Sequence, residues 1–210
     1  MPPGQATGRT CNLTLEIALK LESNTDSRGR PGHLFNMANL SKYQLARPCA
    51  ASMAAIQELA ERIADKLSFG PGDPLEPVVD ALGGKISYQS FNDLDSTASG
   101  SILIEKNGSF RIFLPDYTSH LRDRFSIAHE LGHYFLHFVM LDQKCAIRAE
   151  RYGSTRVEHE ANWFAAAFLM PEAEFKRTHT AFRGNILKIA RKFAVSEAAA
   201  RVREKVVFGN

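Results

Sequence analysis

The sequence has few cysteines, no long apolar run and little net charge, and each absence excludes a class of protein. Its three cysteines, Cys11, Cys49 and Cys145, form no CxxC pair, so we expect reduced thiols in a cytoplasmic protein rather than a disulfide framework. The longest apolar stretches, such as residues 163–170, are far too short to cross a bilayer. No basic head followed by an apolar run marks a secretory signal, and we expect no membrane partner.

The charge is unevenly distributed, although the net value of +3 for 210 residues indicates no partner by itself. Residues 176–210 hold nine basic residues against two acidic ones, Glu197 and Glu204. A basic end on a slightly acidic body permits weak contact with nucleic acid or an acidic partner, and a solvated helical face explains the pattern equally well. The candidate contacts are basic side chains of this segment: Arg191, Lys192, Arg201 and Arg203.

The composition changes near residue 53. Residues 1–52 are rich in Pro, Gly, Ser, Asn and Arg, as in "SNTDSRGRPGH", so we expect a disordered or poorly ordered extension, with Met53 as a candidate true start. The remainder has regular apolar spacing, and a content of 44% hydrophobic and 23% charged residues suits one globular domain, as a monomer or weak dimer. We assign residues 53–175 to that domain and residues 176–210 to a basic helical segment packed on it.

The periodicity predicts an α+β fold with several helices and one short sheet. Residues 85–91 alternate like a strand, and "GSILIEKNGSFRIFLP" indicates a hairpin around Asn107-Gly108, a pair favoured in a type I′ turn. We expect its first strand, residues 101–105, at an edge of the sheet, which is either purely structural or a place where a substrate peptide could pair. Helices are predicted over about 54–67, 74–82, 119–139, 155–170, 185–193 and 196–206.

The helix predicted over 119–139 contains the motif "AHELGH". His129 and His133 are four residues apart, so their imidazoles lie on one helical face at a separation that suits one tetrahedral Zn²⁺. Glu130, about 100° further round, can serve as a general base but not as a third ligand. The flanking residues are apolar, so the alternative is a buried helix with hydrogen-bonded core histidines. Gly132, a poor helix former, suggests that a neighbouring backbone approaches closely here.

A catalytic zinc needs a third protein ligand and an open position. The next helix, in "EHEANWFAAAFLMP", offers Glu160 in an early turn, which we assign as the inward-facing third ligand. Glu158 and His159 are its rivals. We expect Glu158 to act instead in a capping box with Thr155, and His159 points about 100° away from Glu160.

Together, "RFSIAHELGHYFLH" and "EHEANWFAAAFLMP" resemble the ImmA/IrrE metallo-endopeptidases, gluzincin-type proteins of bacteria and their mobile elements. The segment "IARKFAVS", residues 189–196, is similar to the family's L-A-x-x-F-G-V-S, which precedes a final helix. The resemblance covers roughly residues 54–208. It implies a zincin-like (gluzincin) domain with a short mixed or antiparallel sheet, and it implies a C-terminal segment like a helix-turn-helix.

The resemblance implies a site with zinc as its cofactor. His129, His133 and Glu160 correspond to the zinc ligands, and Glu130 corresponds to the base that activates zinc-bound water. Such sites often add a side chain that stabilises the oxyanion, and the sequence does not choose among Tyr134, Tyr152, His120 and His179. His137 continues the histidine stripe, and we expect it beside the ligands rather than among them.

The function implied is a zinc endopeptidase of narrow specificity that cleaves a helix-turn-helix repressor to derepress a mobile element or a stress response. The alternative is a non-catalytic regulator that binds DNA or a repressor and retains the protease fold. Ala194 replaces the usual glycine of F-G-V-S, and alanine is strained there if the position requires φ > 0. The chain also resembles the short, phage-type members more than those with an additional C-terminal sensor domain.

Overall fold

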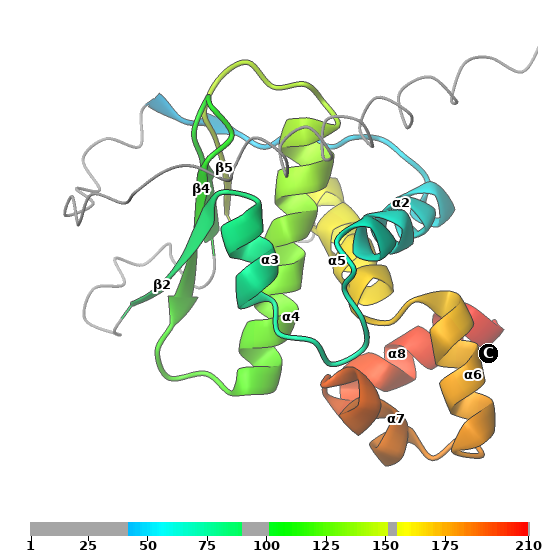
Figure 1. The fold of residues 1–210 in the computed structure, drawn as a ribbon. Helices are drawn as coiled ribbons and strands as arrows, with labels where there is room; N and C mark the ends of the chain where they lie inside the picture. The colour runs from blue at the N-terminus through cyan, green and yellow to red at the C-terminus, as the bar shows by residue number, and fades with distance from the viewer. Residues whose placement is uncertain (1–41, 90–100, 151–154, 210) are drawn as a thin grey trace, which may run out of the picture.

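The computed structural model describes residues 42–89, 101–150 and 155–209 and shows an α+β fold, as predicted (Figure 1). Five strands form one mixed sheet: β1 (Gln44–Leu45), β2 (Gly84–Gln89), β3 (Ser101–Ile104), β4 (Phe110–Pro115) and β5 (Ile147–Glu150). The helices are α2 (Met53–Lys66), α3 (Glu76–Ala81), α4 (His120–Gly132), the π-helix η2 (His133–Val139), α5 (Arg156–Leu169), α6 (Glu172–Ala181), α7 (Ile186–Phe193) and α8 (Glu197–Phe208). Of the predicted extension, residues 1–41 lie outside the described residues.

The sheet has the strand order β1-β5-β3-β4-β2. Strand β3 pairs antiparallel with both β4 and β5. At the two edges of the sheet, β2 pairs in parallel with β4 and β1 pairs in parallel with β5. The prediction that residues 101–105 form an exposed edge is therefore wrong, because β3 has a neighbour on each side. Strand β5 pairs with β3 on the side opposite β4. It has only four residues, too few to be predicted from periodicity.

The hairpin is present, but its turn differs from the predicted type. Gly108 has φ of 82°, whereas Asn107 is not among the residues with positive φ, so a type I′ turn is excluded. Glu105 N–H donates to Ser109 O and Gly108 N–H donates to Glu105 O, both at 2.8 Å. This is a three-residue loop in which a type I turn is followed by a left-handed glycine.

The hydrophobic core lies between the sheet and the helices, where apolar side chains of both are buried. Alternate residues of β3 and β4, including Ile102, Ile104 and Ile112, are fully buried against the helical layer. Helix α5 packs on both α2 and α4, while α4 also contacts β4 (Figure 1). Most of the longer helices begin at a Ser, Thr or Asn whose side chain accepts a backbone N–H of the first turn. These caps are Ser52, Ser119, Thr155, Asn185 and Ser196.

Residues 42–52, which we expected to be part of a disordered extension, contain β1 and a segment that crosses to α2 (Figure 1). Tyr43 is buried, and the N–H groups of Cys49 and Ala50 donate to Glu160 of α5. The side chain of Arg156 donates to Ala51 O, also from α5. The folded part of the chain thus begins before residue 53.

The C-terminal segment consists of three helices, where the sequence predicted only two. Helix α6 was not predicted: the predicted helix over 155–170 stops before Pro171, and in the structure this proline begins a new helix. Helix α7 ends at Ala194, whose φ of 51° is left-handed, and α8 follows after Val195 and Ser196. No helix within the described ranges has the length and apolarity that crossing a membrane requires.

Arg203 of α8 is buried, with an exposed fraction of 1%. Its Nε donates to Met170 O at 2.9 Å, and its Nη2 pairs with Glu61 Oε1 at 3.1 Å. It thereby joins α8 to α2 and to the end of α5, and it is not available as a surface contact. The other three basic candidates, Arg191, Lys192 and Arg201, are exposed.

Candidate metal centre

The candidate site lies where α4 and α5 cross, and Gly132 sets the distance between them. A Cβ at this position would lie 3.0 Å from Ala161 O, 3.1 Å from Ala161 Cα and 3.2 Å from Phe164 Cβ. Any larger residue would therefore push α5 away. The expectation that Gly132 admits a neighbouring backbone is met, and the approach brings the first turn of α5 opposite the histidines of α4.

Three side chains converge at this crossing: His129 and His133 of α4 and η2, and Glu158 of α5. The Nε2 atoms of the two histidines are 3.0 Å apart. Glu158 Oε2 lies 3.2 Å from His129 Nε2, and its Oε1 lies 3.3 Å from His133 Nε2. Two ligands bonded to one tetrahedral zinc at about 2.0–2.1 Å lie about 3.3 Å apart, so this arrangement fits such an ion.

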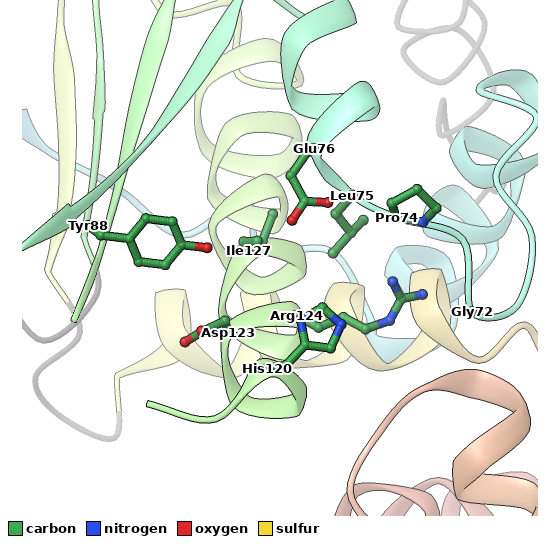
Figure 2. Close-up of a pocket in the computed structure, with 9 residues that line it drawn as sticks. All are labelled: Gly72, Pro74, Leu75, Glu76, Tyr88, His120, Asp123, Arg124 and Ile127. Atoms are coloured by element: carbon green, nitrogen blue, oxygen red, sulfur yellow. The ribbon is translucent and has the colours of Figure 1, made fainter. Parts of the chain in front are cut away.

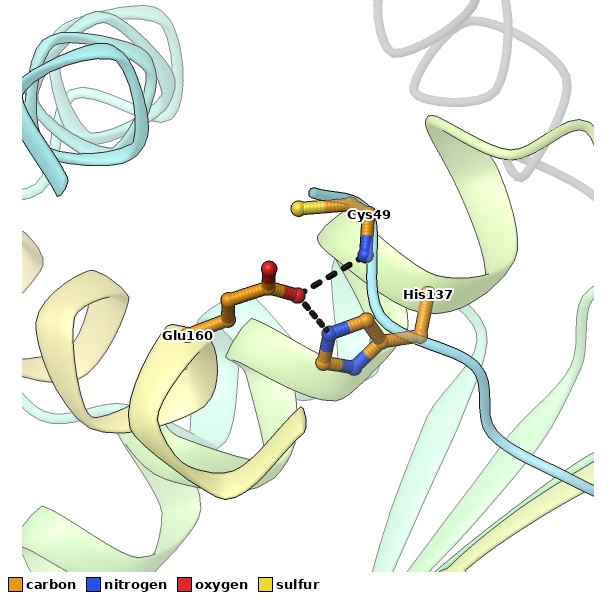
Figure 3. A group of neighbouring side chains, drawn as sticks. All are labelled: Cys49, His137 and Glu160. Atoms are coloured by element: carbon orange, nitrogen blue, oxygen red, sulfur yellow. Dashed lines mark hydrogen bonds and ion pairs between the residues drawn. The ribbon is translucent and has the colours of Figure 1, made fainter. Parts of the chain in front are cut away.

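Glu160, the predicted third ligand, does not join His129 and His133. Its Oε2 lies 3.1 Å from His137 Nε2 and accepts from Cys49 N–H at 2.8 Å (Figure 3). The reason is rotational: residues 158 and 160 differ by about 200° around α5, so they face opposite sides of that helix. Glu158, which we expected to serve as a capping residue, is the carboxylate that faces the pair of histidines. The capping hydrogen bond to Thr155 uses only its backbone N–H.

Asn162 is a further site residue that we did not predict. Its Oδ1 lies 3.0 Å from His129 Nδ1, so with this orientation of the amide His129 donates from Nδ1 and directs the lone pair of Nε2 at the cluster. A signal was present in the sequence: Asn162 is polar in an apolar helix and lies four residues after Glu158, on the same face.

The surroundings of His133 and Glu158 lower the pKa of both groups, for different reasons. Burial, with smaller contributions from His129 and His137, lowers the pKa of His133 to about 3, so its imidazole is neutral. Burial alone would raise the pKa of Glu158, but the close approach of the His129 and His133 rings outweighs it and lowers the value to about 2. The neutral imidazole of His133 and the ionised carboxylate of Glu158 thus meet His129 in a buried site, and this donor set is suited to a divalent cation.

Residues 83–205, more than half of the chain, match the protein family described as Peptidase_M78, the IrrE N-terminal-like domain. The chain belongs to this family. The match spans α4 and α5 and so includes the whole metal cluster. It also confirms the family resemblance of the two motifs.

A solved structure with a related fold is a Mycobacterium tuberculosis transcriptional regulator, with a TM-score of 0.50 and 21% sequence identity. The alignment covers 72% of the IrrE-like chain and 47% of the regulator, so this chain spans about half the length of that protein. The likeness shows a shared fold. No curated protein matches the chain.

Of the other predicted site residues of the IrrE-like chain, Glu130 lies beside the metal cluster, whereas Tyr134 and His179 lie elsewhere. Glu130 is buried on α4 next to His129. Tyr134 is fully buried and packs on Phe110, within the core. His179 pairs with Glu204 of α8, at 2.9 Å, rather than joining the metal cluster. Tyr152 lies outside the described residues, and the choice of an oxyanion-stabilising residue stays open.

His120 lines a separate pocket of about 120 Å³ between α3, the end of β2 and the start of α4 (Figure 2). Arg124 and Ile127 also line it, and helical periodicity places them on the side of α4 roughly opposite His129 and His133. The pocket is therefore distinct from the metal cluster. Its lining combines apolar, acidic and basic residues: Gly72, Pro74, Leu75, Glu76, Tyr88, His120, Asp123, Arg124 and Ile127.

Proposed function

We propose that this protein is a zinc-dependent endopeptidase of narrow specificity. The observation that supports it most is the convergence of His129, His133 and Glu158 on one buried point, with Glu130 beside them, in a chain of the IrrE-like family. Three protein ligands leave the fourth position of a tetrahedral ion open, as catalytic zinc sites require. A purely structural site would need a fourth ligand, and the cluster found among the described residues contains three.

When bound, a zinc ion supplies Lewis-acid chemistry, polarising the scissile carbonyl and making water a nucleophile near neutral pH. The residues of the chain supply the remaining chemistry. Glu130 accepts the proton of the attacking water and transfers it to the leaving amine. Asn162 holds the ring of His129 through Nδ1, which orients its Nε2 lone pair toward the ion.

The proposed substrate is a helix-turn-helix transcriptional repressor, whose cleavage would derepress a mobile element or a stress response. Support comes from the family resemblance and from the related fold of a protein named as a transcriptional regulator. The direct test is to sequence the neighbouring genes and to incubate the protein with zinc and any small helix-turn-helix protein that they encode. One discrete cut supports the proposal.

The Glu130→Gln variant separates catalysis from metal binding. Because Glu130 is not a ligand in this geometry, the variant should bind one zinc per chain as the wild type does. It should lose at least about 100-fold in cleavage rate, since general-base catalysis contributes 10²–10⁴-fold. Zinc content by elemental analysis and a time course of repressor cleavage measure the two effects. Retained biological activity in Glu130→Gln would overturn the protease proposal.

The second candidate function is a regulator that binds DNA or a repressor without turnover. The arrangement of α7, a tight turn and α8, with Arg191, Lys192 and Arg201 exposed, favours it. Under this alternative, duplex DNA should shift in a gel, the shift should weaken steeply with salt, and replacing Arg191 and Lys192 by alanine should abolish it. Arg177→Ala is a matched control, because Arg177 is an exposed cation of α6 outside the turn.

A further inference from the structure

A second group of ligand-like side chains lies beside the metal cluster: Cys49, His137 and Glu160 (Figure 3). Their candidate donor atoms all lie within 4.8 Å of one another, and Glu160 and His137 are fully buried. Two interpretations compete. The group is either a second metal site or a hydrogen-bonded support for the first one.

The hydrogen bonds of Glu160 argue against a second ion. Its Oε2 accepts from Cys49 N–H at 2.8 Å and faces His137 Nε2 at 3.1 Å, while its Oε1 accepts from Ala50 N–H at 3.1 Å and from Arg156 Nε at 2.8 Å. A carboxylate offers about four acceptor positions, and all are used here. Burial raises the pKa of the Cys49 thiol to about 12, so in the absence of a metal this side chain is a neutral thiol.

The same hydrogen bonds fix the proton positions on two histidines. An ionised carboxylate only accepts, so His137 carries its proton on Nε2 and presents a lone pair at Nδ1. His133 Nδ1 lies 3.0 Å from His137 Nδ1, and therefore it must be the donor. The remaining nitrogen of His133, Nε2, is then left with a lone pair directed at His129 and Glu158. That is the form of imidazole that binds a metal.

We propose that Glu160 and His137 are positioning residues that fix the tautomer and ring orientation of His133 for metal binding. The inference rests on the proposed zinc function and extends it to residues that do not touch the ion. The π-helical turn η2 contributes, because it places His137 one turn below His133 with their rings 5.1 Å apart.

The positioning group extends to the segment that crosses from β1 to α2. Ala50 has φ of 57°, a left-handed conformation that is strained for a non-glycine residue. In this conformation the successive N–H groups of Cys49 and Ala50 both meet Glu160. Such a pair of adjacent N–H groups is an anion-binding arrangement of the backbone. The segment thus fixes the position of the Glu160 carboxylate. Glu160 in turn orients His137, and His137 orients His133.

The test measures zinc affinity in the full-length protein by competition with a chromophoric chelator, together with zinc content per chain. Glu160→Gln should bind one zinc with an affinity lowered roughly 10- to 100-fold, the usual effect of removing such a supporting partner. Cys49→Ala is the comparison variant: it keeps the backbone N–H that donates to Glu160 and removes only the thiol, so its affinity and content should stay close to those of the wild type. Two zinc ions in the wild type and one in Cys49→Ala would establish a second metal site and overturn the inference.

Substitutions at His137 test the direction of the hydrogen bonds. Glutamine offers both an acceptor and a donor, so His137→Gln should retain more zinc affinity than His137→Leu, which offers neither. Equal affinities of wild type, His137→Leu and Glu160→Gln would overturn the inference while leaving the proposed function intact. A wild type that binds no zinc would instead refute the proposed function.

An NMR measurement keeps the inference testable if the His137 variants fail to fold. In a long-range proton–nitrogen spectrum of the zinc-loaded wild type, His137 should appear as the Nε2–H tautomer. A proton on Nδ1 of His137 would mean that the hydrogen bond to His133 runs the other way, and the proposal would be wrong.

Discussion

At the scale of single residues, the two glutamates of α5 have different roles although they are only two positions apart. Glu158 faces His129 and His133, whereas Glu160 faces His137 and the backbone of residues 49–50. The sequence could not separate them, because both are buried and α5 is covered on both sides. Only the rotation of the helix, set by where Thr155 caps it, decides which carboxylate meets the metal cluster.

This difference predicts that Glu158→Gln abolishes stoichiometric zinc binding. An amide neither carries the charge nor binds zinc as a carboxylate does, so affinity should fall by more than about 100-fold, beyond the effect of a supporting residue. Chelator competition gives the affinity, and Glu197→Gln, an exposed carboxylate in the first turn of α8, is the control. Zinc binding that survives Glu158→Gln but vanishes in Glu160→Gln would restore Glu160 as the ligand.

At the scale of helices, the crossing of α4 and α5 depends on Gly132. Gly132→Ala adds a methyl group within 3.2 Å of Ala161 and Phe164, and overpacking of this kind costs about 1–3 kcal/mol. The better helix propensity of alanine offsets about 1 kcal/mol of this. We expect a net destabilisation of up to about 2 kcal/mol in denaturant unfolding, with weaker zinc binding because Glu158 moves away from the histidines. A higher unfolding midpoint with unchanged zinc affinity would contradict the close packing of the two helices.

The turn between α7 and α8 contains a second strained residue, Ala194. It occupies the position after the helix end, with φ of 51°, and Val195 N–H donates back to Ala190 O at 3.0 Å. This is the Schellman geometry in which glycine is preferred. The sequence indicated the strain, because alanine replaces the glycine of the family segment. The structure shows that the turn forms nonetheless.

Ala194→Gly should therefore stabilise the protein. Removing the left-handed strain gains about 1–2 kcal/mol, and the greater flexibility of glycine in the unfolded chain costs about 0.5–1 kcal/mol. The net gain of up to about 1.5 kcal/mol corresponds to a rise of up to roughly 6 °C in Tm for a protein of this size. Differential scanning calorimetry measures it, with Ala198→Gly in the exposed first turn of α8 as a destabilising control. A lower Tm for Ala194→Gly would contradict the positive φ.

At the scale of the whole molecule, the sequence predicted the elements that local patterns specify and missed those that depend on distant partners. The spacing of His129 and His133, the Thr155 cap and the hairpin are local, and each is present in the structure. Strands β1 and β5 are short and depend on distant partners: β1 pairs with β5, and β5 pairs with β3. The role of residues 49–51 likewise depends on α5, more than 100 positions later, so composition alone suggested disorder.

The whole metal-free protein should lose stability as the pH falls. The folded pKa of His133 is about 3, below the ordinary value of 6.5, so the unfolded chain binds its proton first and stability declines as pH falls below about 6.5. The pKa values of Glu158 and Glu160, each lowered to about 2 from 4.5, extend the loss below pH 4.5. Stability is therefore fully present above pH 6.5. A single group contributes up to about 1.4 kcal/mol per pH unit between its two pKa values.

Urea unfolding in the presence of a chelator, at pH 8, 7, 6 and 5, measures this dependence. The free energy of unfolding should be level between pH 8 and 7 and should fall by about 1–2 kcal/mol by pH 5, with most of the change below pH 6.5. His133→Asn removes the titrating ring and should flatten the profile in this range, whereas His159→Asn, exposed on α5, should not. A metal-free wild type that gains stability between pH 7 and 5 would show that His133 is protonated in the folded state, and its Nε2 would then not be available to a metal.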